Sequence, residues 1–318
     1  MTGASGHLGY VVYRTLLKEP WSLNLLLRQP VDYLDDHNFF TVYGRLEARA
    51  ALVRLVDDCD AVIHMAAKVW PTFLPNERVN KINYECARDL YQIAMEQGVK
   101  HFVFVSSIHS MITPDEDVLD EDTSLYTGRK KPYDKAKADM ERFLKDQDED
   151  TYTILNPTAV IGPGDRYLRG MNQMFQRIEQ DKLPMVTAGG FNVVDVRDVA
   201  LAIKQVVADK ITGKFMLGSK YFEIKELAQL YGQLNGLKVT NKVLGKRMMR
   251  FVAANAAAVE RLKKQPVALN RYAVETLLEA HQNISSQRAK DTFAWEVRPI
   301  EETLKDIHLW FGEEKFKL

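Results

Sequence analysis

Three glycines near the start of the chain constrain its fold more than any other feature. They stand in the string Thr-Gly-Ala-Ser-Gly-His-Leu-Gly, and a helical pattern follows at once. Glycines at this spacing allow a tight turn and a close approach of the backbone to a pyrophosphate, which then lies at the N-terminus of the helix. The segment therefore predicts a dinucleotide-binding loop. We expect the cofactor to contact this loop at Gly3, Ser5, Gly6, His7, Leu8 and Gly9.

Short apolar runs alternate with helical patterns over the first half of the chain, which is typical of βα units and a parallel sheet. The predicted strands are 23–27, 60–65, 101–105 and 152–155, and the predicted helices are 48–56, 77–97 and 132–145. Helices predominate from Glu223 onward, and the chain ends in an amphipathic stretch, 300–311. We predict an α/β fold: a Rossmann-type, doubly wound parallel sheet with a smaller, mostly helical C-terminal part.

The predicted dinucleotide-binding domain comprises residues 1–163, and 193–217 is expected to return to it. Residues 164–192 and 218–318 are the predicted substrate-binding part. A phosphate loop needs a strand that leads into it, yet this loop begins at Thr2. We expect that the first strand is encoded upstream, and that a GTG valine codon has been read as the initiator Met1. A stop codon just upstream would contradict this expectation.

Charge and cysteine content narrow the range of partners and compartments. Lys plus Arg and Asp plus Glu number 43 each, so no overall charge attracts nucleic acid. Two cysteines are too few for a disulfide framework, which favours a reducing cytoplasm. No apolar run predicts stable membrane insertion, although the Ala-rich stretch 251–259, with basic residues upstream, leaves peripheral contact open. The scattered histidines predict no metal site. We expect a small-molecule substrate as partner, and the sequence leaves a homodimer open.

Arg28 directly follows the predicted strand 23–27, where an NAD site would place an acidic residue for the ribose hydroxyls. The planar guanidinium of arginine suits a 2′-phosphate, which it can bind through two hydrogen bonds. A solvated surface arginine is the alternative. The sequence therefore favours NADP over NAD as the cofactor.

Tyr133 and Lys137 stand four residues apart and share one helix face. A phenol with a pKa near 10 is a poor acid–base group at neutral pH, and a nearby ammonium lowers that pKa. Ser107 follows the predicted strand 101–105, and the carboxyl ends of strands carry the ligand chemistry in open α/β sheets. We predict that Ser107 binds a substrate oxygen and that Tyr133 transfers the proton.

Together these features resemble the extended short-chain dehydrogenase/reductase superfamily, also called the NAD-dependent epimerase/dehydratase family. The resemblance extends over nearly the whole chain, through the segments 60–67, 105–107, 156–164 and 194–198. It implies that Ser107 is the catalytic serine, Tyr133 the acid–base group and Lys137 the ribose-binding lysine. It also implies cofactor contacts at Ala66, Ala67, Lys68 and Pro157. Leu46 is the candidate adenine contact, where the family often has an aspartate.

Two branches of the superfamily compete. Nucleotide-sugar epimerases and dehydratases commonly have an asparagine where this chain has Ala159, whereas the strings 156–163 and 265–271 resemble dihydroflavonol reductases and 3β-hydroxysteroid dehydrogenases. The resemblance therefore favours an oxidoreductase that acts on a carbonyl or secondary alcohol of a largely apolar substrate. The alternatives are a nucleotide-sugar epimerase/dehydratase and a non-catalytic NAD(P)-sensing regulator. The expected substrate contacts are Trp70, His109 and Tyr167.

Overall fold

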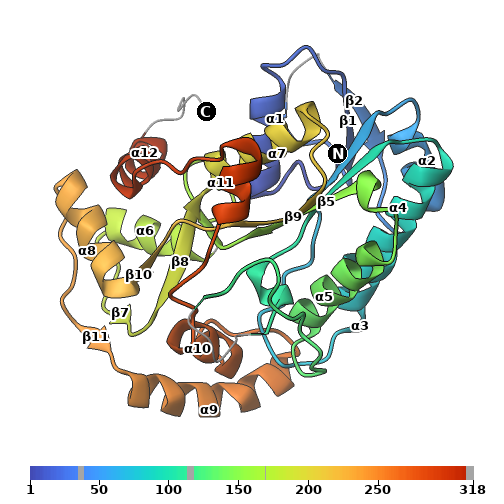
Figure 1. Ribbon diagram of the computed structural model, residues 1–318. Coiled ribbons are helices and arrows are strands. Elements are labelled where there is room, and N and C mark those ends of the chain that lie inside the picture. Colours follow the sequence, from blue (N-terminus) through green and yellow to red (C-terminus); the bar gives the residue numbers. More distant parts are fainter. Residues whose placement is uncertain (35–38, 113–117, 169, 313–318) are drawn as a thin grey trace.

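A parallel β-sheet with helices on both faces forms the first part of the molecule (Figure 1). The computed structural model describes residues 1–34, 39–112, 118–168 and 170–312. Its elements are α1 His7–Leu16, β1 Leu23–Leu27, β2 Phe39–Tyr43, α2 Arg49–Val56, β3 Ala61–His64, α3 Glu77–Asn80, the π-helical turn η1 Lys81–Glu85, α4 Cys86–Glu96, β4 His101–Val105, the 3-10 turn η2 Ile108–Ser110, α5 Pro132–Lys145, the 3-10 turn η3 Glu149–Thr151, β5 Tyr152–Pro157, β6 Ala159–Ile161, α6 Met171–Glu179, β7 Val186–Thr187, β8 Gly190–Asp195, α7 Val196–Ala208, β9 Gly213–Leu217, β10 Lys220–Glu223, α8 Ile224–Asn235, β11 Val243–Leu244, α9 Lys246–Lys263, α10 Arg271–Leu278, α11 Gln287–Phe293 and α12 Ile300–Gly312.

The order of the strands confirms the predicted Rossmann-type sheet. Strand β2 pairs with β1, and β3, β4, β5 and β9 follow one another, all in parallel. Thr2 lies between the two groups, because it forms parallel bridges to Leu26 of β1 and to His64 of β3. The chain winds away from Thr2 in both directions, so the strand order reverses there. Open α/β sheets bind their ligands at such a point, outside the carboxyl ends of the strands.

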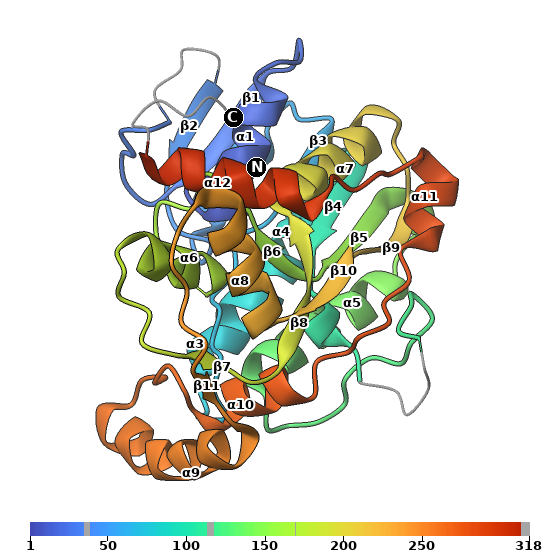
Figure 2. The same cartoon turned by 90° about the vertical axis from the view of Figure 1, so that its left-hand side faces the viewer.

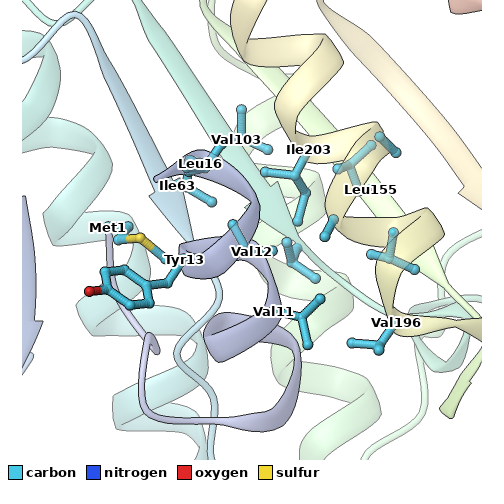
Figure 3. Packing of buried hydrophobic residues seen from close by; sticks show 14 of the residues in the cluster. Met1, Val11, Val12, Tyr13, Leu16, Ile63, Val103, Leu155, Val196 and Ile203 are labelled. Atoms are coloured by element: carbon cyan, nitrogen blue, oxygen red, sulfur yellow. The ribbon is translucent and has the colours of Figure 1, made fainter. Parts of the chain in front are cut away.

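The two faces of this sheet are covered by different helices because successive side chains of a strand point to opposite faces. Val103 and Val105 of β4 pack with α1 and α7, whereas Phe102 and Phe104 pack with α2, α4 and α5. Figure 3 shows the first of these layers, where Val11 and Val12 of α1 meet Val196 and Ile203 of α7. Each fully buried side chain of this size contributes about 1.5–3 kcal/mol relative to exposure.

A second set of strands lies beside the main sheet. Strand β8 is the centre of a small sheet in the order β10-β8-β6, which the sequence did not predict, and β7 pairs with β11. Helices α6, α8 and α12 pack around this small sheet, while α9 and α10 form a separate cluster at the edge of the molecule (Figures 1 and 2). Among the described residues, none of the helices combines the length and the apolar character needed to cross a bilayer.

Candidate functional site

The glycine loop has the shape that a phosphate requires. A side chain at Gly3 would place its Cβ 2.8 Å from the Ala66 nitrogen, and one at Gly9 would lie 1.9 Å from the Gly3 carbonyl oxygen. These two glycines allow the loop to pack against β3 and against α1. Helix α1 begins at His7 with Gly6 as its N-cap, without a side-chain cap and without an acidic residue in its first turn. Its terminal N–H groups and its dipole therefore suit an anion.

Neighbouring segments hold this loop in place. The Tyr33 hydroxyl donates a hydrogen bond to the Ser5 carbonyl oxygen at 2.8 Å, and the His7 Nε2 lies 3.1 Å from the Pro163 carbonyl oxygen. The Tyr167 hydroxyl lies 3.4 Å from that of Tyr33. The structure thus places Tyr167, an expected substrate contact, beside the glycine loop.

Arg28 and Leu46 follow two adjacent strands at the same edge of the sheet. Leu27 of β1 pairs with Tyr43 of β2, so both strands end at this edge. The Arg28 side chain is exposed and forms no ion pair with any of the described residues. Leu46 is half-buried and packs against the cluster under α2. These two side chains flank the region where the strand order predicts the adenosine end of a dinucleotide.

The segment after β3 is held by a buried asparagine. The Lys68 nitrogen donates to the Asn83 Oδ1 at 2.7 Å, and the Asn83 Nδ2 donates to the Lys68 carbonyl oxygen at 3.0 Å. Asn83 belongs to the π-helical turn η1, which interrupts the helix predicted over 77–97; such turns often occur at functional sites. Ala66 is half-buried and Ala67 is exposed. Pro157, the last residue of β5, is buried and pairs with Leu217 of β9.

Ser107 and Tyr133 meet at the carboxyl end of β4. Ser107 is buried, and its hydroxyl lies close enough to the phenol of Tyr133, near the start of α5, to affect the pKa of that phenol. Burial raises the pKa of Tyr133, the negative charge of Asp134 raises it further, and the Ser107 hydroxyl lowers it. The phenol is therefore protonated at neutral pH and suited to donate a proton to a substrate oxygen.

Lys137 lies one turn further along α5 and is only 1% exposed. Its Nζ donates to the Val105 carbonyl oxygen at 2.7 Å and lies 4.5 Å from the centre of the Phe104 ring. Burial lowers the pKa of Lys137 to about 7, against the opposing effect of Glu141. The sequence predicted that this ammonium would lower the pKa of Tyr133. In the structure burial and Asp134 dominate, so that pKa is raised instead.

Glu141 lies behind Lys137, fully buried in a polar cluster that the sequence analysis missed. Its carboxylate accepts hydrogen bonds from the Ser106 hydroxyl and from the Asn156 Nδ2, the latter at 2.8 Å. The Nζ of Lys214, on β9, lies 3.1 Å from its second oxygen. A signal was present in the sequence, because Tyr133, Lys137 and Glu141 stand four residues apart on one helix face.

Aromatic side chains gather around Tyr272, whose hydroxyl bonds the residue that follows Tyr133. The Tyr272 hydroxyl, on α10, donates to the Asp134 carboxylate at 2.8 Å. The Tyr272 ring centre lies 5.8 Å from that of Phe73 and 6.4 Å from that of His109. Trp70 lies in the same loop as Phe73, where its Nε1 donates to the Leu74 carbonyl oxygen at 2.8 Å. We call the group Trp70, Phe73, His109 and Tyr272 the aromatic wall.

The structure therefore divides the predicted site residues into three groups. Ser107, Tyr133 and Lys137 meet at the end of β4, with His109 and the loop of Trp70 beside them. Arg28 and Leu46 lie at the end of β1 and β2, and Tyr167 lies at the glycine loop. Phe73 and Tyr272 were not predicted from the sequence. Tyr272 directly follows the string 265–271, which had served only to separate the two branches.

Comparisons with known proteins agree with this geometry. A family model described as the NAD dependent epimerase/dehydratase family matches residues 1–218. Sterol demethylase protein B of Methylococcus capsulatus is 24% identical over 322 residues, which cover 98% of each chain. A ceramide reductase of Caulobacter vibrioides is 29% identical over 179 residues, covering 56% of this chain and 50% of that protein.

The fold also matches solved structures. A UDP-glucose 4-epimerase from Bifidobacterium longum, in complex with NAD+ and UDP, aligns with a TM-score of 0.78 at 16% identity. The alignment covers 100% of this chain and 98% of the epimerase, and at this identity it concerns the fold alone. The glycine loop, the sheet order and the family match over more than half of the sequence lead to one conclusion. The chain belongs to the NAD-dependent epimerase/dehydratase family and is an NAD-dependent oxidoreductase of the extended short-chain dehydrogenase type.

Proposed function

We propose that the protein reduces a carbonyl, or oxidises a secondary alcohol, on a largely apolar substrate. The observation that carries this proposal is the aromatic wall, which the hydrogen bond from Tyr272 to Asp134 joins to helix α5 at the residue after Tyr133. Small-molecule sites are usually lined by such apolar surface with a few polar groups that fix the orientation. The names of the two relatives, which refer to a sterol and a ceramide, support a substrate of this class.

The protein's own groups would position the substrate and move one proton. A bound nicotinamide supplies or accepts the hydride at the substrate carbon. Ser107 would donate a hydrogen bond to the substrate oxygen, and Tyr133 would give its proton to that oxygen in reduction or receive one in oxidation. Because the pKa of Tyr133 is raised, the phenol is ready for reduction at neutral pH, and oxidation would become faster as the pH rises. From the family resemblance we propose that Lys137 binds the ribose.

The experiment that tests this function separates the two branches of the family. Purified protein would be mixed with NADH or NADPH and a panel of sterol ketones and other apolar ketones, and in parallel with UDP-glucose. We expect cofactor oxidation with an apolar ketone and no UDP-galactose. Ala159, at the start of β6, offers no side-chain amide to a sugar nucleotide. Epimerisation of UDP-glucose without net cofactor oxidation would overturn the proposal.

We further propose that NADP is preferred over NAD, because the exposed Arg28 guanidinium at the end of β1 is available for a 2′-phosphate. Arg28→Ala should weaken NADP binding by about 1.5–3 kcal/mol and leave NAD binding nearly unchanged. Titration calorimetry with both cofactors measures this difference. Arg54→Ala, at an exposed position on α2, is the matched control. Equal losses of binding free energy for NADP and NAD would show that Arg28 does not bind the 2′-phosphate.

A further inference from the structure

Helix α9 runs along the edge of the molecule (Figure 2), and only a narrow face of it is buried. Met249 and Ala253 on that face are buried against Val274 of α10. The outward side is different, since Phe251 is 67% exposed and Leu262 is 85% exposed. We call the exposed apolar side chains of α9 its outer face; they are Met248, Phe251, Val252, Val259 and Leu262.

The outer face is continuous because its members follow helical spacing. Steps of three and four residues lead from Met248 to Phe251 and Val252, then past Asn255 to Val259 and Leu262, so these side chains share one side of the helix. Asn255 lies in the middle of this side, and its Nδ2 donates to the Phe251 carbonyl oxygen at 2.8 Å. The one polar group within the outer face is therefore already satisfied by the helix.

All the exposed charges of α9 and its C-cap are positive. These residues are Lys246, Arg247, Arg250, Arg261, Lys263 and Lys264. The acidic residue of the helix, Glu260, is buried and accepts hydrogen bonds from the Thr72 hydroxyl at 3.0 Å and from the Asn270 Nδ2 at 2.6 Å. Within the part of the chain that the structure describes, none of the six cations forms an ion pair. In a chain with no net charge, α9 thus concentrates uncompensated positive charge beside an apolar surface.

We propose that α9 docks on the surface of an anionic phospholipid bilayer. The helix would lie in the plane of the interface, with Phe251 and Leu262 inserted below the headgroups and the arginines at the lipid phosphates. A second copy of the chain fits this surface less well, because a two-fold interface would bring the basic residues of α9 against one another. Nucleic acid would satisfy the cations but leave the outer face in water. For a cytoplasmic protein, the available surface is the anionic inner leaflet.

The position of α9 connects this docking surface to the candidate site. Thr72 belongs to the loop that carries Trp70 and Phe73, and its hydroxyl donates a hydrogen bond to the Glu260 carboxylate. In the same loop, the Pro71 carbonyl oxygen accepts a hydrogen bond from the Asn270 Nδ2 at 2.8 Å. The next helix, α10, carries Tyr272 of the aromatic wall. A docked α9 would therefore bring the aromatic wall near the bilayer, where an apolar substrate is concentrated. Only this last step rests on the proposed function.

Vesicle binding tests the docking directly. The full chain would be sedimented with large vesicles of phosphatidylcholine alone, or of phosphatidylcholine with phosphatidylglycerol. We expect binding to the anionic vesicles that weakens as salt is added. Phe251→Gln/Leu262→Gln should reduce the partition coefficient at least about tenfold. Arg247→Gln/Arg250→Gln should reduce it about 25-fold, at roughly fivefold for each cation.

The matched control makes the same kinds of change on another exposed helix. Lys305→Gln/Leu309→Gln on α12 should leave vesicle binding unchanged. Wild-type protein that ignores anionic vesicles would overturn the proposal, as would equal binding after Phe251→Gln/Leu262→Gln. A dimer in sedimentation equilibrium that dissociates in this variant would instead identify the outer face as a self-interface. Vesicle binding needs neither substrate nor turnover, so its failure is distinguishable from a failure of the proposed function.

Discussion

Helices α5 and α9 are both rich in basic and apolar residues, yet they direct their functional side chains in opposite directions. Helix α5 turns Lys137 and Glu141 inward, where both are buried. Helix α9 turns its arginines and its largest apolar side chains outward, and buries mainly alanine and methionine. The difference follows from position, since α5 covers the main sheet, whereas α9 lies at the edge and packs chiefly on α10.

The comparison shows how burial changes the role of a charge. A buried charge has to be partnered, and each partner fixes the geometry further. Lys137 is bonded to the Val105 carbonyl oxygen, and Glu141 to Ser106, Asn156 and Lys214, so the active face of α5 is held rigidly. The cations of α9 have no such partners among the described residues. A buried charge thus serves chemistry at one fixed place, while an exposed charge is available to a partner outside the molecule.

The largest effect should come from the active face of α5. Tyr133→Phe removes the proton donor and keeps the ring, so turnover should fall by about 10³-fold. Cofactor affinity should change little, because the sheet and the glycine loop are untouched. Steady-state kinetics and a cofactor titration measure the two effects. Tyr84→Phe, at a half-buried tyrosine in the turn η1, is the control and should retain full turnover. Wild-type turnover in the Tyr133 variant would exclude this residue as the acid–base group.

The next effect concerns the dependence of stability on pH. Burial lowers the pKa of Lys137 from 10.5 to about 7. Between these values the unfolded chain binds more protons than the native protein, so Lys137 makes the free energy of unfolding rise with pH. Below about pH 7 the native state carries the full cost of the buried charge. Lys137→Met should lack this rise, which amounts to about 4 kcal/mol between pH 7 and pH 10.

Urea unfolding at several pH values measures how the free energy of unfolding rises with pH in the wild type and in Lys137→Met. Lys135→Met is the control, because Lys135 forms an ion pair with Asp139 on the more exposed side of α5. The free energy of unfolding of the Lys135→Met variant should depend on pH in the same way as that of the wild type. If Lys137→Met also ran parallel to the wild type, the lysine would titrate normally in the folded protein.

Much of the fold could be predicted because the main sheet is buried on both faces. Its central strands read as continuous apolar runs, and the predicted strands at 23–27 and 101–105 are confirmed without change. The edge strand β2 was missed, since Phe39–Tyr43 is partly exposed and lacks such a pattern. Tyr133 and Lys137 could be paired from the sequence because helical spacing alone brings them to one face.

The remainder of the site depends on contacts between distant parts of the chain. Tyr272 and Asp134 are 138 residues apart, and no local pattern predicts that their side chains meet. The same holds for Glu141 and Lys214, which come together because β9 pairs with β5 next to α5. Tyr167 stays a predicted substrate contact, and its place near Tyr33 and the glycine loop likewise depends on residues 134 positions apart in the chain. Local spacing thus predicts partners within one helix and not across the sheet.

The smallest effect should come from the outer face of α9 and concerns folding rather than docking. Phe251→Gln/Leu262→Gln should change the free energy of unfolding in the absence of lipid by less than about 0.5 kcal/mol, because both side chains are exposed. Met249→Gln, on the opposite face of the same helix, should cost about 2–5 kcal/mol, because it places an amide among buried apolar side chains. Urea unfolding measures both variants. A large loss in the first variant would mean that the outer face packs on the protein itself, and the contrast with α5 would then disappear. A small loss would mean that these apolar side chains do not stabilise the fold, which leaves them available to a partner outside it.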